Sequence, residues 1–303
     1  MNIAAKSYFR IGRSLKDRFH TSWMLVCLVL VLLLPFFLGF GLLIKSLVLL
    51  KEESIWQLLF SSKWHPLKGE FGFLPFIISS LWVTILSIFI CGPICLFSAI
   101  HLTHYAKRWF LKFIHPVIDI LAGIPSVIYG VWGVVIIVPL ISKAGASFGH
   151  PNSGYTILTG AIVLSIMIIP FVLNILIEVI RAVPQGLVEA SLSLGATKWE
   201  TIKKVILRKA FPGIISAFGL GISRAFGETI AVLMVVGNVV KIPSGVFQAG
   251  YPLPALIANN YGEMLSIPLY DSALMFAALI LFVVVTIFNL GSRYLILHAE
   301  KRI

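Results

Sequence analysis

Six long runs of apolar residues, separated by more polar stretches, dominate the pattern of this chain. The runs cover residues 23–44, 74–100, 116–141, 155–180, 211–240 and 272–292. About 20 apolar residues in a helix cross the hydrocarbon core of a bilayer, and each run reaches that length. A backbone in lipid must satisfy its own hydrogen bonds, so the runs are predicted to be helices. The pattern therefore predicts an all-α integral membrane protein with six spans.

The composition agrees with a protein that faces lipid. Hydrophobic residues make up 59% of the 303 residues and charged residues only 12%, which exceeds what the core of a water-soluble protein of this size requires. A soluble helical bundle is disfavoured because the charge-free runs are too long and too numerous. We expect a cytoplasmic tail at residues 1–22, followed by a single membrane domain at residues 23–303.

The distribution of Lys and Arg predicts which side of the membrane each loop occupies. With the N-terminus inside, 17 of the 24 basic residues lie on the inner side and 6 on the outer side, and Arg224 lies within a span. Basic residues accumulate in cytoplasmic loops, so both termini and the loop between the fourth and fifth runs are predicted to be cytoplasmic. This bias places the net charge of +12 against membrane lipid, and no nucleic-acid partner is needed to explain it.

The loop between the fourth and fifth runs has the local signals of two helices joined by a turn. Pro184 suits the start of a helix through residues 185–194, and Gly195 can adopt the left-handed conformation that ends it. Thr197 and Glu200 have the Thr-x-x-Glu spacing of a capping box, in which each side chain accepts a hydrogen bond from the other residue's backbone N–H. These signals predict a rigid helix-turn-helix. The alternative is a basic interfacial loop that only connects two spans.

The third run carries signals for the start and the interruption of a helix. Pro116 suits a first turn, and Asp119 within that turn is favoured by the helix dipole. We interpret Asp119 as helix-end electrostatics, and a functional intramembrane carboxylate is the alternative. Farther along, Gly123 and Pro125 interrupt the helix, and irregular backbone at membrane depth is tolerated where it packs on protein or lines a cavity. This span is therefore expected to face the interior.

Motifs for catalysis and for metal binding are absent from the sequence. There is no His-Glu-x-x-His, no Gly-x-Ser-x-Gly and no Gly-rich phosphate loop ending in Gly-Lys-Ser/Thr. The three cysteines, Cys27, Cys91 and Cys95, lie in apolar runs and are interpreted as small buried hydrophobes. The histidines His101, His104 and His115 flank a basic loop and are interpreted as interfacial. We expect no enzyme activity and no cofactor on this chain, so that any ATPase would be a different polypeptide.

Several stretches of the chain resemble the permeases of the bacterial phosphate ABC importer. Four of them are residues 69–75 (GEFGFLP), 121–130 (LAGIPSVIYG), 181–184 (RAVP) and 193–202 (SLGATKWETI). The run at residues 227–238 (GETIAVLMVVGN) resembles the C-type permease subunit more than its A-type partner. The similarity extends over residues 69–293, which is most of the chain.

The resemblance also covers the polar loop, where Glu189-Ala190-Ser191 followed by Gly195 is similar to the Glu-Ala-Ala…Gly signature of ABC importer permeases. In that family the loop docks into a groove on the ATPase. The resemblance identifies residues 182–209 as an ATPase-coupling loop. Its expected coupling residues are Glu189, Ala190, Gly195, Thr197 and Glu200. Ser191 replaces the family's Ala, and Leu207-Arg208 replaces its common Leu-Pro pair, which predicts a softer bend after the loop.

The resemblance implies the type I ABC importer permease architecture in the inner (plasma) membrane of a bacterium. It implies four partners besides lipid: an A-type permease, two cytoplasmic ATPase subunits that carry ATP and Mg²⁺, and a phosphate-binding protein on the outer side. The ATPase would drive alternating access to a central cavity.

Arg224 and Glu228 are the candidate residues of the transport pathway. Their i, i+4 spacing predicts that they share one helix face and neutralise each other. A charge at the bilayer centre costs about 2.5–3.5 kcal/mol, so ionisable residues there indicate a functional site. A guanidinium binds phosphate oxygens through two parallel hydrogen bonds, and we expect transient contact of Arg224 with phosphate while Glu228 holds it in place. The alternative is a structural ion pair.

Two other transport functions remain as alternatives. Another oxyanion, such as sulfate or molybdate, fits the same architecture. An ATP-independent channel or secondary transporter is less consistent, because it would need intramembrane carboxylates or coupling-ion sites. Only Glu228 and Asp119 meet that need, and the coupling loop would then have no role.

Overall fold

The computed structural model describes residues 3–262 and 267–300 and contains six helical stretches long and apolar enough to cross a membrane. They are α1 (Ile3–Glu52), α3 (Leu74–His104), α5 (Ser126–Trp132) continued by the π-helical turn η2 (Gly133–Ile137) and α6 (Val138–Ser147), α7 (Ile157–Arg181), α9 (Lys198–Thr201) continued by the π-helical turn η3 (Ile202–Ile206) and α10 (Leu207–Gly227), and α13 (Pro268–Glu300). The predicted number of spans is confirmed. The bounds of the third and the fifth differ from the prediction.

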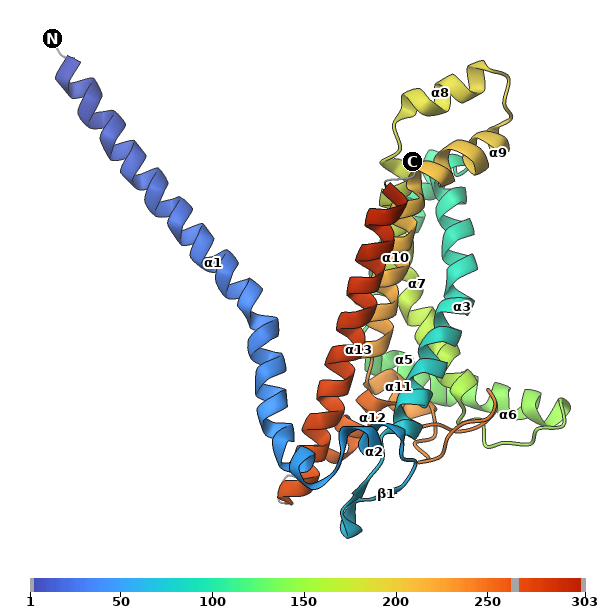
Figure 1. Cartoon of the computed structure of the whole chain (residues 1–303). Coiled ribbons are helices and arrows are strands. Elements are labelled where there is room, and N and C mark those ends of the chain that lie inside the picture. Colours follow the sequence, from blue (N-terminus) through green and yellow to red (C-terminus); the bar gives the residue numbers. More distant parts are fainter. Residues whose placement is uncertain (1–2, 263–266, 301–303) are drawn as a thin grey trace.

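Shorter elements gather at the two ends of the bundle. At the end opposite α8 (Gln185–Ser193) lie α2 (Ile55–Phe60), the antiparallel strands β1 (Trp64–His65) and β2 (Glu70–Phe71) with the 3-10 turn η1 (Pro66–Lys68) between them, α11 (Ile230–Val235) and α12 (Leu253–Asn260) (Figure 1). Helix α1 begins and α13 ends at the end that carries α8 (Figure 1). This arrangement is the one expected for an even number of spans.

Helix α7 is the centre of the bundle. It packs against α3, α10, α11 and α4 (Arg108–Gly123). In the most apolar window of α7, 67% of the residues are buried, against 0% in α1. Helix α1 therefore leaves most of its apolar surface to the surroundings; its main packing partner is α13, and it diverges from the other helices (Figure 1).

The helix boundaries predicted for the third span, residues 116–141, are wrong in its first part. Pro116 lies inside α4, so Asp119 is an exposed residue of that helix and does not lie in a first turn. The helix ends at Gly123, Ile124 is extended (φ −67°, ψ 128°) ahead of Pro125, and α5 begins at Ser126. A proline disfavours helical conformation in the residue before it. The interruption expected at this place is confirmed, but apolar side chains continue across it and concealed the boundary.

Tight approach of α6 to the following loop depends on Gly154. Its φ of +85° lies in the left-handed region, and an added Cβ would meet the carbonyl oxygen of Val138. Gly149, in the same loop, has φ +77° but no heavy atom within 4 Å of an added Cβ. The two glycines share a conformation and differ in the space around them.

This difference predicts unequal effects of alanine. Gly149→Ala should lower the free energy of unfolding by about 1–2 kcal/mol through left-handed strain alone, and Gly154→Ala by about 1–3 kcal/mol more through overpacking. Thermal unfolding of the detergent-solubilised protein measures both. Equal losses of stability in the two variants would contradict the close packing at Gly154.

Candidate functional site

Residues 182–209, which the sequence predicts to be a coupling loop, begin with two short helices joined by a turn, as the local sequence predicts. Helix α8 starts directly after Pro184, and Gly195 takes φ +83° in the turn that follows. Thr197 precedes α9, its side chain accepts from the backbone N–H of Glu200, and the Glu200 side chain accepts from the backbone N–H of Thr197 at 3.0 Å. The expected capping box is therefore confirmed. The N-cap at Thr197 is worth about 0.5–2 kcal/mol, which favours one defined shape.

A contact that the sequence did not reveal joins the two helices. The hydroxyls of Ser191 on α8 and Thr201 on α9 lie 2.9 Å apart, within hydrogen-bond distance, and Thr201 is fully buried. The N–H of Ala196 also donates to the carbonyl of Ser191 at 3.3 Å. Ser191 is the position that departs from the Glu-Ala-Ala signature, so the hydroxyl that distinguishes this chain ties α8 to α9.

Lys198 fastens the coupling loop to the membrane bundle. Its Nζ donates to the carbonyl of His104, at the end of α3, and lies 4.5 Å from the centroid of the Tyr105 ring. A cation over an aromatic face is held by the ring quadrupole. Ile202 and Ile206, the first and last residues of η3, are fully buried. The start of the fifth span is therefore held in place by contacts with α3 and with the core.

The outer surface of the coupling loop remains uncovered. No residue of α8 is buried, Glu189 and Ala190 are exposed, and α8 projects beyond the bundle (Figure 1). Apolar side chains are exposed on the same surface, Leu194 at 88% and Trp199 at 48%. The whole of α8 is therefore accessible in the isolated chain.

The interpretation of Arg224 and Glu228 as a pair on one helix face is wrong. Helix α10 ends at Gly227, and Glu228 is extended (φ −73°, ψ 127°). In the described part of the chain the ion pairs are His65–Glu70 and Lys204–Glu200, and neither includes Arg224 or Glu228. The predicted span at residues 211–240 contains several glycines, and an isolated glycine is tolerated inside a helical pattern, so the sequence did not single out Gly227 as the end of a helix.

Arg224 is supported by a different residue. Its guanidinium carbon lies 4.7 Å from the centroid of the Phe171 ring on α7, and its side chain is exposed in the isolated chain. A ring face stabilises the cation without occupying its N–H donors. These N–H donors therefore remain available to an anion. A carboxylate partner would have competed with the anion for them. The sequence alone could not identify Phe171 as the partner of Arg224, since it is one of many apolar residues in its run.

The other sequence candidates do not assemble into a second site. His115 lies 3.3 Å from Arg181 through Nε2, and the His101 ring stacks on Tyr105. The sulfur atoms of Cys91 and Cys95 lie 3.3 Å apart within α3. Across the described residues, no three His, Cys, Asp or Glu side chains are grouped so that they could hold a metal ion.

Curated relatives of this chain are permease proteins. It is 40% identical over 241 residues to the probable ABC transporter permease protein YqgH of Bacillus subtilis (strain 168), covering 79% of this chain and 77% of that protein. It is 34% identical over 258 residues to the phosphate transport system permease protein PstC of Xylella fastidiosa (strain Temecula1), covering 80% and 79%. PstC of Haemophilus influenzae is 35% identical, covering 84% of this chain and 87% of that protein.

Solved structures show the same fold at low sequence identity. A chain of a bacterial alginate ABC transporter, in complex with an alginate-bound periplasmic protein, aligns with a TM-score of 0.62 at 16% identity, covering 94% of this chain and 96% of that chain. A chain of the inward-facing MetNI methionine ABC transporter aligns with a TM-score of 0.57 at 21% identity, covering 73% and 93%. The architecture is that of a type I ABC importer permease.

Residues 92–302 match the sequence pattern of one family, described as the binding-protein-dependent transport system inner membrane component. The match covers the interrupted third span, the coupling loop and Arg224. On this match and on its relatives, the chain belongs to the family of binding-protein-dependent transport system inner membrane components.

Proposed function

We propose that this chain is the C-type permease subunit of an ATP-driven importer of inorganic phosphate. The observation that carries the proposal is the exposed helix α8, followed by the capping box of α9, at one end of a six-span bundle whose relatives include phosphate transport permeases. The chain supplies half of the transmembrane pathway. An A-type permease supplies the other half, two cytoplasmic ATPases bind ATP and Mg²⁺, and an extracytoplasmic phosphate-binding protein delivers the anion.

The coupling loop transmits the motion of the ATPase to the membrane. Glu189 and Ala190 lie on the exposed helix α8, which docks onto the ATPase, and the turn at Gly195 passes the displacement to α9. From α9 to the end of α10, residues 198–227 form one helical run. Glu200 and Arg224 lie on this run, roughly 36 Å apart along its axis at 1.5 Å per residue. A movement of the loop therefore moves Arg224 with it, which couples ATP hydrolysis to the pathway.

Arg224 makes transient contact with phosphate in the pathway. A guanidinium matches phosphate oxygens with parallel hydrogen bonds, and the Phe171 ring keeps it oriented from behind. Because the contact of Arg224 is with a ring and not with a carboxylate, the anion displaces no ion pair when it arrives. Glu228, beyond the end of α10, adds negative charge near the site and favours release of the anion, which transport requires.

The assignment is tested by uptake in proteoliposomes that contain both permeases and the ATPase, with ATP inside and the binding protein outside. We expect uptake of labelled phosphate that depends on ATP and is inhibited by vanadate. If sulfate or molybdate is taken up in preference to phosphate, that anion and not phosphate is the substrate. Uptake in the absence of the ATPase would overturn the ATP-driven mechanism.

Gly195→Ala tests the coupling loop. A Cβ at φ +83° costs about 1–2 kcal/mol and favours a different turn between α8 and α9. We expect ATP-driven uptake to fall several-fold in a complex that still assembles, as measured by initial uptake rates. Gly149→Ala has the same strain outside the loop and should leave uptake unchanged. Equal uptake by the two variants would argue against the turn as a transmission element.

Arg224→Gln tests the pathway. Loss of a charged hydrogen-bond donor worth about 1.5–3 kcal/mol should lower phosphate uptake about tenfold or more, while ATPase activity and assembly persist. Arg224→Lys keeps the charge without the planar donors and should be intermediate. Arg293→Gln, which removes an exposed arginine of α13, is the matched control. Normal uptake by a correctly inserted Arg224→Gln protein would eliminate the proposed contact.

A further inference from the structure

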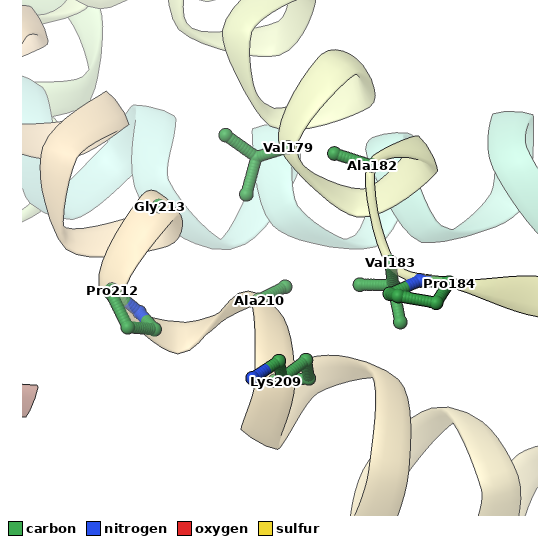
Figure 2. A pocket seen from close by; sticks show the side chains of 8 residues that line it. All are labelled: Val179, Ala182, Val183, Pro184, Lys209, Ala210, Pro212 and Gly213. Carbon is green, nitrogen blue, oxygen red and sulfur yellow. The ribbon is translucent and has the colours of Figure 1, made fainter. Parts of the chain in front are cut away.

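A cavity of about 490 Å³ lies where the end of α7 meets the beginning of α10. Its apolar wall comes from both sides, as Figure 2 shows, with Val179 and Ala182 facing Ala210 and Pro212 across a common opening. Val183 and Pro184, which connect α7 to α8, complete the wall. The cavity therefore lies directly beside the connection between the bundle and the coupling loop.

Lys209 is the single ionisable residue that lines this cavity. Among the described residues it has no hydrogen-bond or ion-pair partner, and Glu178, the acidic residue next to the wall, is exposed and also takes part in no described ion pair. A lysine beside an apolar cavity carries a charge that the protein itself does not balance. The ligand that fits combines an anionic group with a hydrocarbon part.

The position of the cavity along the membrane normal supports the same kind of ligand. Helix α7 ends at Arg181, and the exposed cations Lys203, Lys204 and Arg208 precede or adjoin Lys209. The charge bias of the loops assigns this end to the cytoplasmic surface, where anionic lipid headgroups are attracted to Lys and Arg. Beyond Lys209 the wall continues through Pro212 and Gly213 into the apolar part of the span.

We propose that this cavity is a binding site for an anionic phospholipid, with the lipid phosphate on Lys209 and an acyl chain against the wall formed by α7 and α10. A free phosphate ion would find a single cation among otherwise apolar side chains, which does not repay its desolvation. A phospholipid uses both features. Because Val183 and Pro184 form part of the wall, a bound lipid braces the connection to α8 and steadies the coupling loop.

The site is tested with the complete transporter in nanodiscs of phosphatidylcholine containing increasing fractions of photoactivatable phosphatidylglycerol. We expect crosslinks to residues 179–184 and 209–213. Lys209→Gln should weaken this crosslinking about fivefold, since one lysine near the membrane surface contributes about 1 kcal/mol. Lys209→Arg keeps the charge and should crosslink like the wild type, which separates loss of charge from loss of folding.

Two further variants complete the experiment. Lys112→Gln removes an exposed cation of α4, outside the cavity, and should leave crosslinking at these residues unchanged. Ala182→Phe fills the mouth of the cavity with an aromatic ring and should reduce crosslinking with Lys209 intact. Equal labelling of wild type and Lys209→Gln, displacement of the lipid by millimolar inorganic phosphate, or occupation of the cavity by a partner subunit would each overturn the proposal.

Discussion

The absence of water in the bilayer core is the constraint on which this structure depends. Backbone N–H and C=O groups there must bond within the chain, so long apolar segments become helices. The helices are interrupted at Ile124–Pro125 and after Gly227. Irregular backbone is tolerated in a membrane where it packs against protein or lines a cavity. The second break follows Arg224 closely, which places the charged side chain beside a non-helical segment.

A single helical run connects the two candidate functional regions. It begins at the capping box beside the bundle surface and ends three residues after Arg224. Its start is held by Lys198 against the end of α3 and by buried isoleucines below. The π-helical turn η3 lies within this anchored section. Such turns recur at functional positions in helices, and here η3 lies between α9 and α10.

Three regions of the molecular surface differ in the chemistry that they expose. The exposed apolar side chains of α1 belong to a helix long and apolar enough to cross a membrane, whereas the exposed leucines and Trp199 on either side of the Gly195 turn belong to α8, α9 and their connection. Between these two regions lies the cavity of α7 and α10, with one unpaired lysine at an apolar wall. The three surfaces are therefore suited to a hydrocarbon, a protein and an amphipathic molecule, respectively.

The sequence by itself determined the features that depend on neighbouring residues. Six spans followed from apolar length, and the cap at Thr197, the turn at Gly195 and the break at Gly123–Pro125 followed from backbone preferences that act within a few positions. Only the tertiary structure decided the partner of Arg224, because contact with Phe171 joins residues 53 positions apart and any apolar residue of that run was an equal candidate. The end of α10 was likewise decided only by the tertiary structure, since hydropathy does not distinguish a helix from an irregular apolar segment that is sheltered by protein.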